Sequence, residues 1–377
     1  MIYLDSAATT FQKPNSVLNA VTYAMKHYAS VGRGGYSAAA AAAEAVFACR
    51  EFAADMFDCE PEQVVFTMNA THGLNIAIRS LVKPGSRVVV SGFEHNAVLR
   101  PLRALGAEIF VAGRKLYDPQ DTLMSFEKSV TKDVSAVICT HVSNVFGYIL
   151  PVEEIGELCR KKGIPFIVDA SQSAGILPVS LRKMNADFIA MPGHKSLYGP
   201  QGTGMLLCGR LPAPFICGGT GSMSANMEMP DMLPDRAEAG THNVPGICGL
   251  FAGLRFVRSV GTEKIRSHEQ KLAAVMIKNL EKEKGIQLYR AGSESFTGVL
   301  SFSVQKKDCE KFAASLAKRE IAVRAGLHCA PLAHESAGTL HCGTVRVSFS
   351  AFSTLREVNR ASEVIARICH EKNWDIS

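Results

Sequence analysis

The sequence predicts an α/β protein with a large, mostly parallel seven-stranded sheet and a smaller α+β unit toward the C-terminus. Between residues 60 and 210, seven short apolar runs alternate with amphipathic stretches. Such alternation is typical of parallel strands connected by helices that cover both faces of the sheet. The chain has 377 residues, more than one hydrophobic core usually accommodates, so we expect two domains.

The elements of the large sheet follow from this pattern in order. Residues 37–57 contain six consecutive alanines and no glycine or proline, which predicts a long helix before the sheet. The amphipathic stretches predict helices at 73–81, 97–105 and 152–162. The predicted strands are 64–67, 87–90, 109–112, 136–140, 165–168, 188–191 and 205–208.

The chain after residue 211 has a different pattern. Residues 212–250 are rich in Gly, Pro and Met, which predicts a loop crossing between lobes or subunits. One or two long helices are expected over 249–284, followed by strands at 298–304 and 344–350 and helices at 307–318 and 355–370. We therefore expect a large domain over 14–250 and a small α+β domain made of 1–13 and 251–377.

Composition argues against several classes of protein. The 41 Lys and Arg against 35 Asp and Glu give a net charge of +6, spread along the chain without a run of like charges, so nothing indicates nucleic-acid binding. We find neither a secretory signal nor a segment apolar enough to span a membrane. The eleven cysteines, none spaced as C-x-x-C, indicate thiols in a reducing compartment. We expect a cytoplasmic enzyme without nucleic-acid or membrane partners.

The first candidate site residue is Lys195, which follows a predicted strand in DFIAMPGHKSLYGPQGTG. A lysine amine that loses its charge in a pocket can form a Schiff base with an aldehyde, and His194 with nearby backbone donors can hold an anion. The alternative is a solvated surface lysine in a turn. Upstream, Asp169 ends another strand, where a carboxylate can pair with a protonated ring nitrogen and Gln172 can bind a ring oxygen. The alternative for Asp169 is a helix N-cap.

Two further strand ends carry polar residues. In FTMNATHGLN, Thr71 and the amides around Ala70 lie where a helix begins, which is a common phosphate site. His95 follows another strand and can stack on a flat ring and relay protons. Each of these residues also has an ordinary structural role available, Thr71 as an N-cap and His95 at a helix start. All four signals, however, lie at one edge of the predicted sheet.

With these residues together, the chain resembles the class V aminotransferase family of fold type I pyridoxal-phosphate enzymes, in the branch of cysteine desulfurases and selenocysteine lyases. The matching segments cover nearly the whole chain in the family's order. They are LDSAATT (4–10), ATHGLN (70–75), EHNA (94–97), HVSNVFG (141–147), DASQSAG (169–175), GHKSLYGPQGTG (193–204), EAGT (238–241), RAGLHC (324–329) and VRVSFS (345–350).

The resemblance implies roles for individual residues. Pyridoxal 5'-phosphate would be bound through Lys195, with Thr71 and His194 on its phosphate. A homodimer would share its active sites, because Thr241 would reach the phosphate of the other subunit's cofactor and Arg33 would lie near the site. The residues expected to handle the amino-acid substrate are Asn144, Arg324 and Arg346. A guanidinium that binds a carboxylate bidentately suits Arg346, for which a surface charge at a strand end is the alternative.

Cys329 is the expected sulfur-collecting nucleophile. It lies in RAGLHC, in a stretch that predicts a mobile loop, and His328 with Arg324 would favour its thiolate. The alternatives are a structural thiol or a zinc site, since two more histidines and a second cysteine follow within fifteen residues. Their spacing fits no compact zinc pattern, so we expect no metal.

The expected activity is therefore the conversion of L-cysteine to L-alanine with sulfur left on Cys329 as a persulfide. A sulfur-acceptor protein and a role in iron–sulfur cluster assembly would follow from it. The alternatives are a selenocysteine lyase, a class V aminotransferase or epimerase that does not use Cys329, and a non-enzymatic sulfur carrier, which would not need Lys195. Two residues depart from the family pattern: Pro192 replaces a phosphate-binding serine, and Gly32 replaces a histidine.

Overall fold

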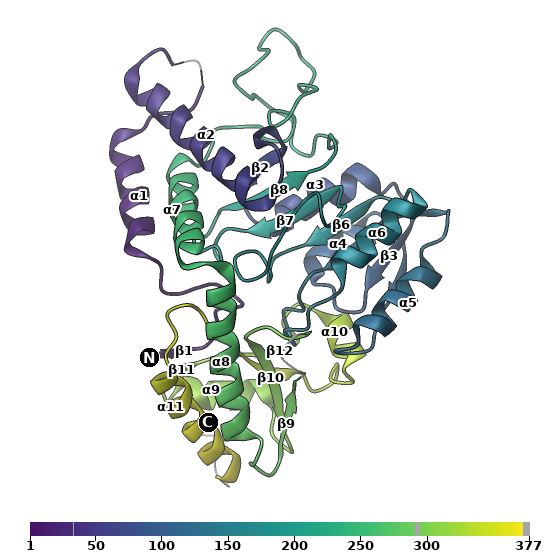
Figure 1. The fold of residues 1–377 in the computed structure, drawn as a ribbon, viewed down its shortest axis with the longest axis vertical. Coiled ribbons are helices and arrows are strands. Elements are labelled where there is room, and N and C mark those ends of the chain that lie inside the picture. The colour runs from purple at the N-terminus through teal and green to yellow at the C-terminus, as the bar shows by residue number, and fades with distance from the viewer. Residues whose placement is uncertain (33, 291–294, 372–377) are drawn as a thin grey trace.

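The large sheet has seven strands in the order β2-β8-β7-β6-β5-β3-β4 (Figure 1). The computed structural model describes residues 1–32, 34–290 and 295–371. Only β8 runs antiparallel to its neighbours, so the sheet is mixed but mostly parallel. The strands are β2 (Val64–Thr67), β3 (Arg87–Ser91), β4 (Glu108–Ala112), β5 (Val134–Thr140), β6 (Phe166–Asp169), β7 (Phe188–Pro192) and β8 (Gly204–Cys208).

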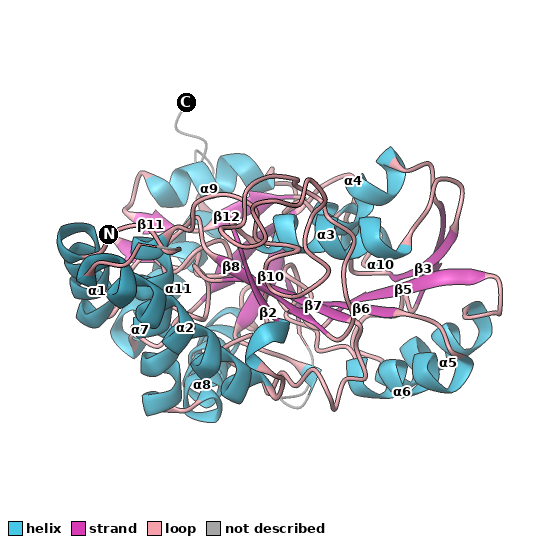
Figure 2. Cartoon of the chain, turned by 90° about the horizontal axis from the view of Figure 1, so that it is seen from above, coloured by secondary structure: helices cyan, strands magenta, loops and turns pink. Residues whose placement is uncertain are grey.

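Helices cover both faces of this sheet (Figure 2). One face packs on α3 (Ala70–Leu81) and α4 (Asn96–Ala104), and the other on α2 (Ser37–Phe57), α5 (Pro119–Ser129), α6 (Val152–Lys162) and α7 (Val244–Val260). The strands supply both cores by alternation. In β5, Ala136 and Ile138 belong to the core beside α3 and α4, whereas Val137 and Cys139 belong to the other core.

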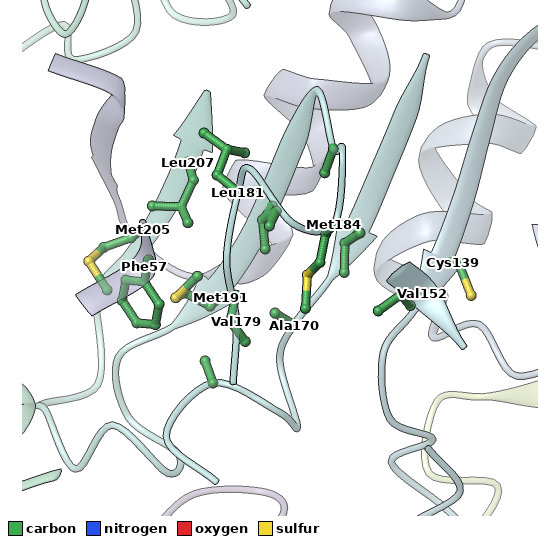
Figure 3. Close-up of a cluster of buried hydrophobic side chains, with 14 of the residues drawn as sticks. Phe57, Cys139, Val152, Ala170, Val179, Leu181, Met184, Met191, Met205 and Leu207 are labelled. Atoms are coloured by element: carbon green, nitrogen blue, oxygen red, sulfur yellow. The ribbon is translucent and has the colours of Figure 1, made fainter. Parts of the chain in front are cut away.

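The core on the second face is closed by a loop as well as by helices. Figure 3 shows Met191 of β7 and Leu207 of β8 in the same cluster as Phe57, the last residue of α2. Val179 and Met184, from the segment between β6 and β7, complete this cluster. Because β6 and β7 are buried along their whole length, the residues that follow them are attached to tightly packed strands.

The smaller unit is built on a four-stranded antiparallel sheet of order β12-β13-β10-β9. Its core contains side chains of α8, α9 and α11 and is separate from the two cores of the large sheet. The remaining elements are α1 (Asn15–His27), η1 (Pro61–Gln63), α8 (Thr262–Leu280), β9 (Ile286–Tyr289), β10 (Val299–Val304), α9 (Cys309–Ala317), β12 (Arg324–Gly326), α10 (Pro331–Ser336), β13 (Thr344–Ser348), α11 (Leu355–His370) and the paired short strands β1 (Ile2–Tyr3) and β11 (Ile321–Ala322).

The segment that we call the N-terminal strap, residues 4–13, connects the small sheet to the end of β7. At its start, Leu4 accepts a hydrogen bond from the amide of Ser348, and Ala7 donates to the Ser348 hydroxyl. Further along, the Thr10 amide donates to the carbonyl of His194 at 3.1 Å. The strap therefore contacts β13 and the residues after β7 within ten residues of chain.

One sequence expectation differs from the structure here. The predicted loop over 212–250 is wrong in its last part, because α7 begins at Val244. Residue 250 consequently lies within a helix, and the change from the large core to the small one occurs around Gly261, between α7 and α8.

Among the described residues, no single helix is long and apolar enough to cross a membrane, and α7 with α8 reaches that hydropathy only as a pair bent by 79°.

Candidate active site

A cavity of about 190 Å³ opens at the carboxyl ends of the parallel strands. Parallel strands end at the same edge of a sheet, and ligands of α/β proteins bind there. Residues from the ends of β5, β6 and β7 and from the starts of α3 and α4 meet in this cavity. Its walls include Ala70, Thr71, His95, Asn144, Asp169, Gln172, His194 and Lys195.

Lys195 lies in a tight turn three residues after β7. The turn is closed by the Gly199 amide on the carbonyl of Gly193 and by the Tyr198 amide on the carbonyl of Lys195. Burial lowers the pKa of the Lys195 amine to about 8, and Asp169 opposes that shift while Arg346 adds to it. A lysine whose pKa lies near 8 is neutral often enough at physiological pH to act as a nucleophile.

Asp169 and Gln172 lie on the neighbouring strand end. Asp169 is the last residue of β6, is 3% exposed, and accepts a hydrogen bond from the Ser171 amide at 2.9 Å. Gln172 donates one amide hydrogen to the carbonyl of Ala7 in the strap at 2.9 Å. Its second amide hydrogen remains for a ligand, because a glutamine amide has two.

His95 is neutral and its tautomer is fixed. It caps α4, and its Nδ1 accepts a hydrogen bond from the Ala97 amide at 3.0 Å. Burial lowers the pKa of His95 to about 4, although the negative charge of Asp169 acts to raise it. Because Nδ1 is an acceptor, the ring's single proton sits on Nε2. His95 therefore offers one N–H donor.

An anion can be held at the start of α3. Asn69 caps the helix by accepting from the His72 amide, and the first amides of a helix, here those of Ala70 and Thr71, have no acceptor within the helix. Across the cavity, the Nδ1 of His194 is buried and has no hydrogen-bond partner among the described residues. Burial, with the charges of Lys195 and Lys13, lowers the pKa of His194 to about 4.

The expected substrate-binding residues are held together by Asp5, which the sequence did not identify as a site residue. Arg346 donates from Nη2 to Asp5 Oδ1 at 2.8 Å and from Nη1 to the carbonyl of Asn144 at 2.9 Å. Arg324 donates from Nε to the other Asp5 oxygen at 3.1 Å. The signal was present in the quoted LDSAATT motif, but nothing in the sequence links an N-terminal acid to two arginines more than 300 residues later.

Cys329 is exposed and lies close to the cavity wall through its backbone. Its carbonyl accepts a hydrogen bond from the Asn96 amide, next to His95, at 2.7 Å. The preceding carbonyl, of His328, accepts from the Asn144 side chain at 2.9 Å. In this structure the stretch forms a short turn between β12 and α10, and both His328 and Cys329 have left-handed backbone angles, with φ of 49° and 56°.

The expectation that His328 would favour a Cys329 thiolate is wrong. The His328 ring is buried, its Nε2 lies 3.2 Å from the Thr344 carbonyl, and it stacks on His334. Burial, with Arg346 nearby, lowers the pKa of His328 to about 2, so the ring carries no positive charge. Within the described ranges, no three His, Cys, Asp or Glu side chains gather as metal ligands.

Four of the expected residues that the structure describes do not line the Lys195 cavity: Thr241, Arg324, Cys329 and Arg346. Thr241 lines a second cavity of about 220 Å³, together with His72, His242 and Asn243. In its wall, the buried Glu238 binds Arg50 and His242. Arg33 lies outside the described residues. Within this one chain, Thr241 is therefore separated from the other expected cofactor-binding residues.

A lysine and an aspartate after neighbouring parallel strands, lining one cavity, are the arrangement of fold type I pyridoxal-phosphate enzymes. Comparison with known proteins agrees with this class. The chain belongs to the aminotransferase class-V family, whose model matches residues 2–361. Members of this family depend on pyridoxal phosphate, and the match confirms the family, fold class and cofactor expected from the resemblance.

Similar proteins are cysteine desulfurases. A probable cysteine desulfurase of Methanothermobacter thermautotrophicus is 33% identical over 383 residues, which cover 97% of this chain and 94% of the relative. The apo structure of a cysteine desulfurase from Thermococcus onnurineus NA1 matches with a TM-score of 0.90 and 32% identity, over 98% of this chain and 94% of that one. The cysteine desulfurase CsdA of Escherichia coli matches with a TM-score of 0.85 and 26% identity, over 97% and 94%.

The residues of the cavity fit pyridoxal phosphate. The unpartnered buried Nδ1 of His194 and the first amides of α3 are donors that a phosphate would use. Asp169 supplies a buried carboxylate for a positively charged ring nitrogen, and Lys195 supplies an amine for an aldehyde. Pro192 lies in the cavity wall without a hydroxyl, so the phosphate donors come from the other residues.

Proposed function

We propose that this chain is a cysteine desulfurase that converts L-cysteine to L-alanine and keeps the sulfur on Cys329. The observation that carries the proposal is the anchoring of the Cys329 turn on the Lys195 cavity, through Asn96 and Asn144. An aminotransferase or epimerase would have no use for an exposed thiol fixed at this place. The similarity to cysteine desulfurases along almost the whole chain supports the same conclusion.

The roles of the cavity residues follow from their chemistry. When bound, pyridoxal phosphate supplies an aldehyde that bonds to amines and a ring that stores electrons. Lys195 would hold it, with Ala70, Thr71 and His194 on the phosphate, Asp169 at the ring nitrogen and Gln172 at the ring oxygen. His95, with its proton on Nε2, would stack on the ring and donate a hydrogen bond.

Two groups of residues would act on the substrate. Arg346, with Arg324 and Asn144, would bind the carboxylate of cysteine, because a guanidinium can donate two parallel hydrogen bonds to it. The Lys195 amine, once free, would take the proton from the substrate's Cα. In the balanced reaction, cysteine and the Cys329 thiol give alanine and a Cys329 persulfide: the C–S bond of the substrate breaks and an S–S bond forms.

Further aspects of the proposal concern the assembly. We propose a homodimer in which Thr241 completes the partner subunit's site, since Thr241 lies outside the Lys195 cavity of its own chain. The resemblance implies that Arg33 would also be contributed near the shared site. The large domain would comprise residues 14–250, with 1–13 and 251–377 in the small one, and the helix break at Gly261 would refine that boundary. The cysteine content of the chain supports a cytoplasmic location. The proposed chemistry would need a sulfur-acceptor protein, such as one of iron–sulfur cluster assembly.

The proposal is tested by replacing the thiol. Cys329→Ser should bind pyridoxal phosphate and cysteine as the wild type does, yet form no persulfide and release no alanine. Cys342→Ser is the matched control, because Cys342 is also exposed and only 13 residues away. Full activity of Cys329→Ser on cysteine would overturn the role of Cys329. Activity of that variant on selenocysteine alone would identify a selenocysteine lyase.

A further inference from the structure

Lys13, the last residue of the N-terminal strap, contacts the peptide between His194 and Lys195. Its Nζ donates one hydrogen bond to the carbonyl of His194 at 3.0 Å and another to the hydroxyl of Thr10. The Thr10 hydroxyl in turn donates to the carbonyl of Lys195 at 3.2 Å. The ammonium group of Lys13 is thus held beside the two residues that would bind the phosphate and the aldehyde of the cofactor.

Hydrogen bonding alone does not account for a lysine at this place. The His194 carbonyl also accepts from the Thr10 amide at 3.1 Å and from the Thr9 hydroxyl at 3.2 Å. A carbonyl oxygen has two lone pairs, so neutral groups of the strap already supply enough donors. A charged donor is therefore not needed to hold this carbonyl.

The charge of Lys13 has no counter-ion within the described residues. The side chain is half-buried, and burial lowers the pKa of its amine to about 8 without a carboxylate that offsets the shift. Removing an ammonium group from water costs free energy unless an anion compensates for it. The position of Lys13 therefore indicates an anion that the chain itself does not supply.

The phosphate of the cofactor is an anion that would be bound next to Lys13. Among the described residues that line the cavity, Lys195 is the only lysine or arginine, and its amine would be used by the aldehyde. His194 is neutral, because burial and the charges of Lys195 and Lys13 lower its pKa to about 4. A phosphate monoester carries about 1.5 to 2 negative charges at pH 7. The charge of Lys13, which acts on the His194 ring, would balance part of them.

We propose that Lys13 is a positioning residue for the cofactor, which holds the peptide between His194 and Lys195 and supplies a positive charge that favours binding of the phosphate. Lys13 does not line the cavity, so it would act through His194 and through its electric field. The inference rests on the proposed place of the phosphate at His194. It does not depend on the reaction at Cys329.

The test measures how much the phosphate contributes to cofactor binding. Cofactor-free protein is titrated with pyridoxal phosphate and with pyridoxal, which lacks the phosphate, and the ratio of the two dissociation constants is taken. Lys13→Met removes the charge and keeps an unbranched side chain, so pyridoxal phosphate should lose about tenfold of its advantage over pyridoxal. Lys13→Arg keeps the charge and should retain the ratio of the wild type. Lys278→Met, which removes an exposed charge in the last turn of α8, is the control and should also retain it.

Inorganic phosphate gives a second readout that does not involve the Lys195 amine. Its inhibition constant against the binding of pyridoxal phosphate should rise about tenfold in Lys13→Met and stay near that of the wild type in Lys13→Arg. Lys13→Gln, which keeps a donor without the charge, should behave like Lys13→Met in both measurements.

A role of Lys13 in folding alone would weaken pyridoxal phosphate and pyridoxal equally. That result, or a wild-type ratio in Lys13→Met or Lys13→Gln, would overturn the inference. Failure of the proposed function would be seen separately, as a wild type that binds the cofactor but forms no persulfide on Cys329.

Discussion

The Asn96 amide donates a hydrogen bond to the carbonyl of Cys329 at 2.7 Å, and so joins the start of α4 to the turn that carries the thiol. His95, directly before Asn96, lines the cavity. The position of the thiol is thus set by the same helix start that positions His95. This hydrogen bond can be tested by a substitution that removes the backbone N–H, because Asn96 is the first residue of α4.

Asn96→Pro should release the Cys329 turn without unfolding α4. Proline is favoured at the first position of a helix, and His95 before it already has extended backbone angles. The substitution removes the N–H that Cys329 accepts. We expect persulfide formation in a single turnover to slow by about 10- to 100-fold, while the absorbance of bound pyridoxal phosphate and the melting temperature stay near those of the wild type. An unchanged rate would contradict a positioning role of this hydrogen bond.

The pH dependence of cofactor binding should follow Lys195. Because burial lowers the pKa of its amine to about 8, the neutral form is lost as pH falls below 8, not below the ordinary lysine value. The rate at which cofactor-free protein forms the yellow complex with pyridoxal phosphate should therefore rise with pH, with a midpoint near pH 8. Removing the opposing charge with Asp169→Asn should shift this midpoint to lower pH. A midpoint near 10 would contradict the burial of the amine.

Gly175 should be intolerant of a side chain. It has φ of 98°, and an added Cβ would lie 2.1 Å from the carbonyl oxygen of Ser196, the residue after Lys195. Gly175→Ala should therefore displace the Lys195 turn, lower the free energy of unfolding by at least about 2 kcal/mol and weaken retention of the cofactor. Gly106→Ala is the control for backbone strain alone, since φ is 64° and nothing lies within 4 Å. It should cost only about 1 kcal/mol and leave the cofactor bound.

Arg50 and Glu238 form a buried pair at the second cavity, and this pair should contribute strongly to the free energy of unfolding. Glu238 accepts two hydrogen bonds from Arg50, at 2.9 and 2.8 Å, and contacts His242 at 2.7 Å. Burial alone would raise the pKa of Glu238, but His242 and Arg50 outweigh it and leave the pKa below its ordinary value. The stability that this pKa shift provides is thus present at neutral pH and is lost as pH falls through the lowered pKa.

Arg50→Met should leave Glu238 buried without its guanidinium partner and with His242 still in contact, at a cost of about 3 kcal/mol in the free energy of unfolding. Chemical denaturation at pH 7 measures this change. The exposed pair of Arg87 with Asp133 offers the control, and Arg87→Met should cost about 1 kcal/mol or less. Adding Glu238→Gln to Arg50→Met should restore part of the loss. No recovery would mean that packing of Arg50 on Phe66, rather than charge, sets the cost.

The parts that could be predicted from the sequence are those with a local signal. Each strand of the large sheet contains an apolar run, which is buried except in the edge strand β4, so all seven were found. Asp169, His95 and Lys195 were found because each follows such a run. The helix α5 was missed because it is mostly polar and has only Thr122 and Phe126 buried. The strands β11 and β12 have two and three residues, too few to show a period.

Contacts between distant segments could not be predicted. The Asp5–Arg346 pair spans 341 residues and the Arg50–Glu238 pair spans 188, and neither has a local pattern. The state of His328 was misjudged for a related reason. Its neighbour in sequence, Cys329, is exposed, but the left-handed turn directs the histidine ring against Thr344 instead.

The left-handed backbone at Cys329 has a consequence for how this position can change. Residues with a side chain pay about 1–2 kcal/mol to adopt this conformation, whereas glycine adopts it freely. Selection for thermal stability alone would therefore favour replacement of Cys329 by glycine. Keeping a thiol there opposes that drift, so stabilised variants obtained without selection for sulfur chemistry should lose this cysteine sooner than the buried ones.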